Sequence, residues 1–596
     1  MAILRSDQSQ LTYTAEAAQG GDIELSSGNR VTSSNFTTTT DGAVNAGDIK
    51  ITVDSVSNLT NGDFIRIGGK DADNTVIGDD FGDVTVSTTP DVTEFEIRRV
   101  VNIDGSVLTL DRPLGFAHLD EENVEEVDGV SAVANTSYSY ITKVPGVYES
   151  VSVPDMTPTI DPRYYLGTAA KRQAAEFYAG QQSYSGSLGG MVLLDANPLR
   201  FPIGKMITDP STYLSSSDYT GTIQVEAKKG DVFLNLSTET NLDKDGYLHI
   251  TDESGTAPSG TSPTTSGTNR EVVRVKRKST ATGTSTMVQL YEPLRFDHAA
   301  GVNVQEVGTS PTYTHVITPE NDLDTITWHL HMKDSSETDA NDFDRRYYGG
   351  MVDSASISGE EGGLLTFGWD TVNFMGMVHN QKNQATVGTT LFNGDSAGAG
   401  MPKFSVMNSI TASDIDFPAN NPYYFSQGVI KLFGEEIARI RSFNITINNA
   451  TEPRYYITGR HGRNRGPSEI REGRKSYSMS CTLALPDTVA STASTYTGDT
   501  GALEVFKQLI LEGNYGAAAG MNGFAVQVKF TRGTNDTITI DIPGDGTANT
   551  GLNNQGAFIT SAPHNITGDG SALQVDVDMV FRDLKITVVD SQGNYA

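Results

Sequence analysis

Apolar and polar residues alternate along many short stretches of this chain. Clear examples are 49–53, 443–447 and 537–542. Successive side chains of a strand point to opposite faces of a sheet, so this period of two predicts strands with one buried face. Clusters of Gly, Asn, Asp and Thr separate the stretches and supply turns. Only 167–178 and 502–512 show helical spacing. The sequence therefore predicts an all-β protein with one or two short helices.

An internal repeat divides the chain. Its clearest block, Pro-Leu-x-Phe-x-His-x4-Asn-Val-x-Glu-Val, begins at Pro113 and again at Pro293. Such a pattern does not recur by chance, so 32–130 and 215–310 are predicted to be two copies of one small β module. Two copies are too few for a solenoid, so each is expected to fold as its own barrel or sandwich. The residues interpreted as structural in both copies are Pro113, Leu114, Phe116, His118 and Asn123, then Pro293, Leu294, Phe296, His298 and Asn303.

The repeat implies a domain map. Residues 1–31 form an N-terminal segment that precedes the first copy. If the second copy is an insertion, the flanking stretches 131–214 and 311–596 are two parts of a single scaffold. We expect that arrangement.

Charge and composition exclude several classes of protein. The chain has 43 Lys and Arg against 74 Asp and Glu, a net charge of −31, which makes it a poor candidate for wrapping nucleic acid. Cys481 is the only cysteine, so no disulfide forms within the chain. The first residues lack the apolar run of a signal peptide, and no apolar stretch has the length of a membrane helix. We expect a protein made in a cytoplasm that does not insert into membranes.

Motifs for chemistry are missing from the sequence. There is no nucleophile elbow, phosphate loop or zinc spacing. The recurring His118 and His298 have no Cys or paired His beside them, so they are predicted to hydrogen-bond turn backbone. His329 and His331 share one face of a predicted strand, but no third ligand is evident, and exposed or half-buried strand histidines are expected. We assign no catalytic, cofactor-binding or metal-ligating residue, expect no cofactor, and do not expect an enzyme.

One segment, 454–475, runs against the overall acidity. Glycines and Pro467 predict a loop, which carries seven cations against two glutamates. A solvated loop and a nucleic-acid site are two interpretations, although its two tyrosines are not interleaved with the arginines as a stacking platform requires. We favour contact with an acidic surface on another copy of the chain, because opposite charges across an interface fix register. The cations are Arg454, Arg460, Arg463, Arg465, Arg471, Arg474 and Lys475.

A series of predicted segments follows a fixed order in the second half of the chain. The segments are a strand pair at 349–367, a strand at 437–449 ending in paired Asn, a Pro-x-x-Ile-x-Glu-Gly turn at 467–473 followed by a strand at 476–485, the helix at 502–512, and closing strands at 573–581 and 584–589. In this order they resemble the tail tube proteins of long-tailed, siphovirus-like viruses of bacteria and archaea. The resemblance covers 160–205 and 340–596, and the two repeated modules depart from it.

The resemblance implies a fold and a function. The fold is a tail-tube-like β-sandwich or barrel scaffold, to which the two modules add small barrels or sandwiches facing outward. Subunits form rings, commonly of six, whose inner sheets close into a continuous barrel, and head-to-tail stacking gives a hollow tube. The tube encloses the tape-measure protein and conducts viral DNA to the host. A wall rich in carboxylates would repel phosphate, so some of the surplus acids are expected to line the bore.

Partners and location follow from the same resemblance. They are further copies of the chain, the tape-measure protein, the tail terminator, baseplate or tail-tip proteins, and DNA in transient, non-specific passage. The protein is synthesised and assembled in the host cytoplasm and resides in the virion tail.

Two other functions remain open from the sequence. The duplicated module with polar loop tips suits a virion surface or host-attachment protein that binds a glycan or a cell surface. A polysaccharide-degrading enzyme would need a cleft with paired carboxylates, and nothing in the sequence singles out such a pair.

Overall fold

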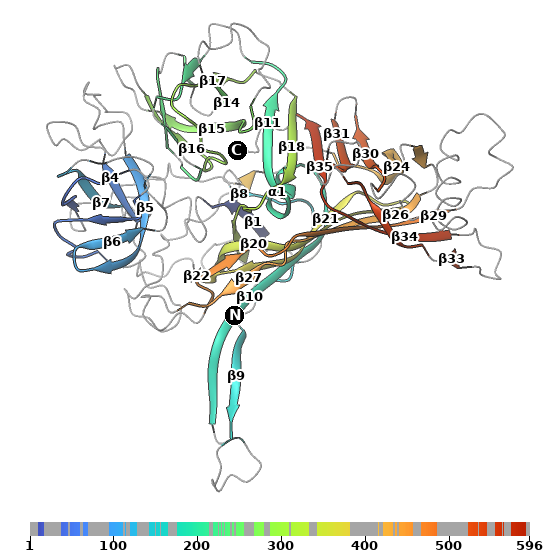
Figure 1. The fold of residues 1–596 in the computed structure, drawn as a ribbon, viewed down its shortest axis with the longest axis horizontal. Coiled ribbons are helices and arrows are strands. Elements are labelled where there is room, and N and C mark those ends of the chain that lie inside the picture. Colours follow the sequence, from blue (N-terminus) through green and yellow to red (C-terminus); the bar gives the residue numbers. More distant parts are fainter. Residues whose placement is uncertain are drawn as a thin grey trace.

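The computed structural model describes residues between 10 and 591, apart from 17–36, 69–94, 128–141, 165–173, 255–266, 279–285, 333–342, 382–414, 457–465, 485–522, 545–554, 566–573 and shorter gaps. The described part is built almost entirely of antiparallel strands, so the all-β prediction is confirmed (Figure 1). Its only α-helix is α1 (Asn197–Ile203). No helix within the described stretches is long and apolar enough to cross a bilayer.

The helix predictions fared worse than the strand predictions. Residues 176–178 open strand β10 (Glu176–Val192), so the helix expected over 167–178 is wrong there. Their pairing with β9 (Thr157–Arg163) holds the backbone extended and overrides a local helical pattern. The helix expected at 502–512 lies outside the described residues. The sequence did not indicate α1, which is short and contains two prolines.

Two stacked sheets form the central sandwich. The larger sheet has fourteen strands and the smaller seven. The larger contains β1 (Gln10–Ala15), β8 (Thr142–Lys143), β9, β10, β19 (Ile326–Met332), β20 (Phe343–Glu360), β21 (Thr366–Phe374), β22 (Gly376–Gln381), β23 (Ile415–Asp416), β26 (Ile440–Asn448), β29 (Ser476–Ala484), β32 (Phe558–Ser561), β33 (His564–Asn565) and β34 (Gln574–Phe581). The smaller runs in the order β11 (Gly204–Pro210), β18 (Tyr313–Pro319), β35 (Lys585–Asp590), β31 (Asp536–Ile542), β30 (Val526–Arg532), β24 (Gly428–Leu432) and β25 (Glu435–Ile437). A single apolar core lies between the sheets.

Two further sheets have six strands each and the same topology. In both, the spatial order is first, sixth, third, fourth, fifth and second strand. Bridges Thr40↔Val53 and Ile223↔Leu236 join the first strand to the second and close each sheet into a barrel. The first barrel comprises β2 (Thr37–Thr39), β3 (Lys50–Thr52), β4 (Phe64–Gly68), β5 (Phe95–Asp104), β6 (Val107–Leu110) and β7 (Asn123–Val127). The second comprises β12 (Thr220–Thr222), β13 (Phe233–Leu236), β14 (Tyr247–Ser254), β15 (Glu271–Lys278), β16 (Thr286–Leu290) and β17 (Val302–Glu306).

Each barrel stands between two strands that pair with each other. The first follows β1 and precedes β8, and these strands pair at Tyr13↔Lys143. The second follows β11 and precedes β18, which pair along their whole length and end at Pro210↔Tyr313. Each barrel has its own apolar core, separate from the core of the sandwich.

Asn449 ties α1 to the large sheet. It is fully buried, and its Nδ2 donates to the carbonyl oxygens of Pro202 and Val352, at 2.9 Å each. The indole Nε1 of Trp369 donates to the carbonyl of Pro198 at 3.2 Å. One member of the paired asparagines is thus an internal anchor for a helix whose residues are all buried.

Asn449→Ala is expected to lower the free energy of unfolding by about 1–3 kcal/mol, because it leaves two buried carbonyls without this donor. Chemical denaturation followed by tryptophan fluorescence measures the change. Asn444→Ala, a partly exposed position on β26, the strand that ends just before Asn449, is the matched control. Equal stability of the two variants would contradict the anchoring role.

Candidate assembly surfaces

One face of the large sheet is apolar and buried, and the other is polar. On β29, β34, β26 from Ser442 and the 354–360 part of β20, buried positions alternate with partly or fully exposed ones. The buried set packs on the seven-stranded sheet, for example through Phe443 and Phe530, whose ring centroids lie 5.8 Å apart. The opposite set, called here the polar face, consists of Ser354, Ser356, Ser358, Ser442, Asn444, Thr446, Asn448, Ser476, Ser478, Ser480, Thr482, Gln574, Asp576, Asp578 and Val580.

Strand register aligns the polar face into rows. Ser358, Asn444, Ser480 and Asp578 are successive partners across four strands. In the next row Thr482 faces Asp576, and its hydroxyl donates to that carboxylate at 2.8 Å. Apart from Val580, the members of this set are small polar side chains, and none of them belongs to the core of the sandwich.

The charge on the polar face has one sign. No residue of the set is a lysine or arginine, whereas Asp576 and Asp578 stand on its outer strand. A third carboxylate, Asp370, lies on β21, which pairs with β20 at the opposite side of the face, and the Ser356 hydroxyl donates to its Oδ1 at 3.0 Å. The polar face therefore repels polyanions and offers no cation to bind them.

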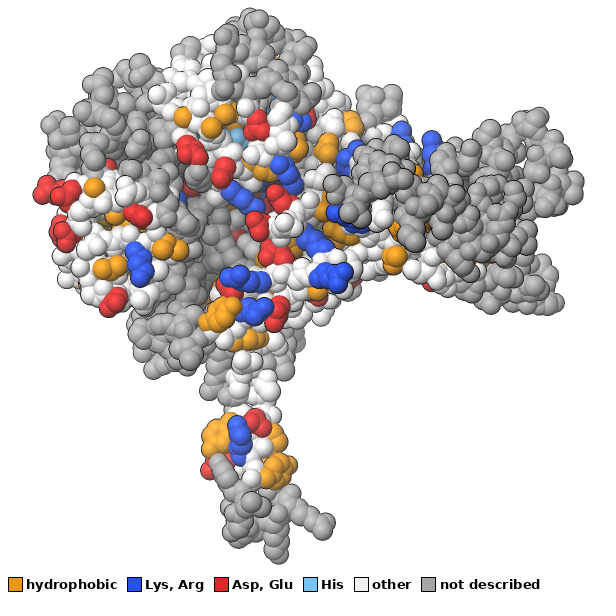
Figure 2. All heavy atoms as spheres, in the orientation of Figure 1, with side chains coloured by type: hydrophobic (Ala, Val, Ile, Leu, Met, Phe, Trp, Pro, Cys, Tyr) orange, Lys and Arg blue, Asp and Glu red, His pale blue; other side chains and the backbone are white. Residues whose placement is uncertain are grey.

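A two-stranded arm extends from the body (Figure 1). It consists of β9 and the first half of β10, paired from Glu176↔Arg163 to Ser183↔Thr157. Large apolar side chains on it face solvent (Figure 2). The exposed fractions are 60% for Ile160, 66% for Tyr164, 70% for Phe177 and 49% for Tyr178. An isolated hairpin is marginally stable in water, and a cluster of exposed aromatic residues marks a contact surface.

A comparison with protein families identifies the chain. The sequence model of the phage tail tube protein family matches residues 158–579, more than half of the chain. The chain belongs to the phage tail tube protein family. No curated protein matches it. The family supports a structural role in the virion tail and assembly into a tube.

The family match of this tail tube protein begins inside β9 and ends inside β34. It therefore includes most of the arm, nearly all of the polar face and the whole second barrel. The first barrel precedes it. The strands that the sequence indicated at 349–367, 437–449 and 476–485 are present as the β20–β21 hairpin, β26 and β29.

The basic segment of the tail tube protein has several local partners. Arg454 on β27 (Glu452–Arg454) pairs with Glu452, and Arg471 on β28 (Glu469–Arg471) pairs with Glu469, at 2.7 Å each on an exposed surface. Lys475 instead turns inward, where its ammonium donates to the carbonyls of Ile203 and Glu320. Arg474 is exposed. Arg460, Arg463 and Arg465 lie outside the described residues.

The two recurring histidines are buried and contact carboxylates. His118 Nδ1 lies 2.5 Å from Glu122 Oε2, and His298 Nε2 lies 2.8 Å from Glu271 Oε1. The sequence predicts turn backbone as the partner of these rings, but each ring contacts a carboxylate. Hydrogen bonds to backbone come from the main-chain N–H groups: His118 donates to the carbonyl of Val44, and His298 donates to that of Ala227.

Most other repeat residues are also internal. Leu114 and Leu294 belong to the cores of the first and second barrels, and Asn123 and Asn303 are almost fully buried. In the second copy Pro293 and Phe296 are buried as well. Pro113 and Phe116 lie outside the described residues.

Only one of the two strand histidines, His329, has a described side chain. His329 is 1% exposed and its Nε2 lies 3.0 Å from Thr14 Oγ1, so the expectation of an exposed or half-buried ring is wrong for it. The side chain of His331 lies outside the described part. Among the described residues, no group of three or more His, Cys, Asp or Glu could hold a metal ion.

Sequence reasoning missed the contact between the second barrel and edge strand β11. Arg270 forms a bidentate pair with Asp209, with N–O distances of 2.6 and 2.7 Å. His249 Nε2 lies 3.4 Å from the same carboxylate. Burial alone would raise the pKa of Asp209, but its contacts with Arg270 and His249 lower it overall. No local sequence pattern marks a pair separated by sixty residues.

Arg270→Gln is expected to destabilise the tail tube protein at pH 7 by about 3 kcal/mol, because it leaves the buried Asp209 without its main counter-charge. A lowered carboxyl pKa stabilises the folded state above the unfolded pKa of about 3.9, and that contribution is lost as pH falls through the folded pKa. The difference between variant and wild type should therefore shrink below about pH 4.

Urea unfolding at several pH values measures this difference. Arg471→Gln removes an exposed ion pair of the same type and should leave stability nearly unchanged. A constant difference between pH 7 and pH 3 would contradict the role of Asp209 ionisation.

Proposed function

We propose that the chain assembles into closed rings, commonly of six subunits, whose polar faces together line the bore of the tail tube. The observation that carries this proposal is the two-sided character of β20, β26, β29 and β34. One side packs into the core, and the residues defined above as the polar face are mostly polar and include no lysine or arginine. Closing this sheet from subunit to subunit also removes its exposed edges.

The chemistry of the polar face suits the passage of DNA. Lysine or arginine in the bore would bind phosphate and slow a moving duplex. Hydroxyl, amide and carboxylate groups keep a layer of water, and Asp370, Asp576 and Asp578 add repulsion. We assign these three residues to the bore, as members of the acidic wall expected from the sequence.

The arm supplies the contact between stacked rings. Burial of its exposed apolar side chains against a second copy of the chain would stabilise the contact, because it removes apolar surface from water. These side chains are Ile160, Tyr164, Phe177 and Tyr178. A head-to-tail contact of this kind does not close on itself and therefore builds a filament. The basic segment 454–475 is assigned to the same class of contact, with its exposed arginines facing an acidic surface of a neighbouring subunit.

The two barrels are proposed to be insertions into hairpins of the scaffold. The strands on either side of each barrel already pair with one another, so a short turn would connect them without the barrel. This arrangement supports modules at 32–130 and 215–310, a segment 1–31, and scaffold parts at 131–214 and 311–596. Insertions are tolerated best where they face solvent, so the barrels are placed on the outside of the tube.

The remaining partners follow from the role of a tube. In a long-tailed, siphovirus-like virion it encloses the tape-measure protein, meets the tail terminator at one end and baseplate or tail-tip proteins at the other, and passes DNA without specific binding. Assembly takes place in the host cytoplasm.

Negative-stain electron microscopy of the purified chain, concentrated at high salt, tests the arm. The wild type should form hollow tubes, whereas Phe177→Ser should give rings or short stacks because an apolar contact between rings is weakened. Tyr424→Ser is the matched control, since Tyr424 is another exposed aromatic, 51% accessible, on the body. Tubes of wild-type length from Phe177→Ser would overturn the role of the arm. Monomers under every condition would overturn self-assembly and favour a surface or host-attachment protein.

A further inference from the structure

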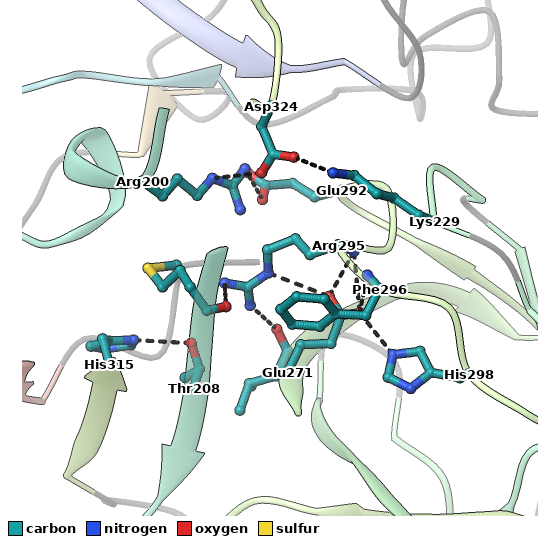
Figure 3. Close-up of polar contacts among 12 residues, drawn as sticks. Arg200, Thr208, Lys229, Glu271, Glu292, Arg295, Phe296, His298, His315 and Asp324 are labelled. Atoms are coloured by element: carbon teal, nitrogen blue, oxygen red, sulfur yellow. Dashed lines mark hydrogen bonds and ion pairs between the residues drawn. The ribbon is translucent and has the colours of Figure 1, made fainter. Parts of the chain in front are cut away.

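A cluster of opposite charges, buried except for Lys229 at its margin, joins the second barrel to the scaffold (Figure 3). Lys143 Nζ of β8 lies 2.8 Å from Glu292 Oε1, which follows β16 of the barrel, and both side chains are less than one tenth exposed. Arg200 of α1 lies 3.8 Å from Glu292 and 3.9 Å from Asp324. Lys229 of the barrel lies 3.0 Å from Asp324 of the scaffold. These five residues are called the junction cluster.

The positive charge of Arg200 is balanced in part by a carboxylate of the second barrel. Arg200 is 1% exposed, and its guanidinium carbon lies over the Phe201 ring, 4.7 Å from the centroid. Its Nε and Nη1 make no hydrogen bond within the described part of the chain, so Glu292 and Asp324 compensate its charge from a distance. A buried charge is costly unless a partner is present, and removing one partner is strongly destabilising.

The dependence runs in both directions. The scaffold supplies Lys143, Arg200 and Asp324, while the barrel supplies Lys229 and Glu292. Burial alone would raise the pKa of Asp324, but Lys229 and Arg200 lower it overall, so Asp324 remains ionised within the cluster. Glu292 of the barrel thus pairs with Lys143 of the scaffold, and Asp324 of the scaffold pairs with Lys229 of the barrel.

The first copy of the module lacks these charges. The repeat aligns Lys229 with Ala46 and Glu292 with Arg112. The described contact of the first barrel is instead with the second, where Arg98 lies 3.7 Å from Asp231. Arg98 is 2% exposed, and the repeat places Val273, a core residue of the second barrel, at the same position. The two copies therefore share a fold but differ in the residues that make contacts.

We propose that the second barrel is a structural hub, which holds β8 and α1 in place through the junction cluster and carries the first barrel through Asp231. The first barrel is the peripheral copy. This inference goes beyond the tube-forming role, because it concerns how the outer modules are fixed to the wall. A ring could form whether or not the second barrel is such a hub. An experiment can therefore contradict the hub without contradicting the proposed function.

Glu292→Gln in the full-length chain tests the hub. This substitution keeps the shape of the side chain but removes its negative charge. Asp324 is then the only acid left in the cluster to balance Lys143 and Arg200. The first thermal transition should fall by several degrees, and hydrogen exchange should accelerate in α1 and β8 as well as in the second barrel. Asp243→Asn is the matched control, an acid-to-amide change at an exposed position of the same barrel, and it should behave as wild type.

A second variant keeps the test decisive if Glu292→Gln folds poorly. Lys143→Gln combined with Glu292→Gln removes both members of the closest pair, so it should recover part of the lost stability, as coupling between direct partners requires. The proposal is overturned if the double variant is as unstable as the sum of the two single variants. It is also overturned if faster exchange in Glu292→Gln is confined to the second barrel while α1 and β8 keep their wild-type rates.

Discussion

Packing of the fourteen-stranded sheet on the seven-stranded sheet is the interaction on which the rest of the molecule depends. This packing buries one face of β20, β26, β29 and β34 and leaves the other face exposed to solvent. Because the period of a strand is two, the apolar set that builds the core also fixes which residues form the polar face. A slip of one residue in register would exchange the two faces. The core therefore defines the surface that we assign to the bore.

The alternating stretches of the sequence were sufficient to predict the all-β class and strands with one buried face. Segments such as 443–447 and 537–542 are strands, and the repeat corresponds to two sheets of identical topology. Local patterns did not predict the secondary structure where pairing or packing with another segment determines it. Residues 176–178 are extended because they pair with β9, and α1 forms where Asn449 and Trp369 satisfy its carbonyls. The arm could not be recognised, because its exposed aromatic residues resemble core residues in sequence.

For the candidate residues too, the sequence predicted some internal positions but not the contacts between segments. Leu114, Leu294 and the recurring histidines are internal, as expected of structural residues in a duplicated module. The pairs His298–Glu271, Arg270–Asp209 and Lys143–Glu292 join segments that are far apart in the sequence. The other recurring histidine, His118, contacts a carboxylate only four residues away. Charge complementarity between distant segments has no periodic signature, so a single sequence does not reveal it. These contacts are what turn two copies of one fold into modules with different surroundings.

A cryo-electron microscopy reconstruction of the assembled tube tests the central claim most directly. The account predicts rings in which Ser358, Asn444, Ser480 and Asp578 point toward the tube axis, with both barrels on the outer wall. A bore lined by the seven-stranded sheet or by either barrel would contradict it. So would a tube in which the polar face is buried between subunits.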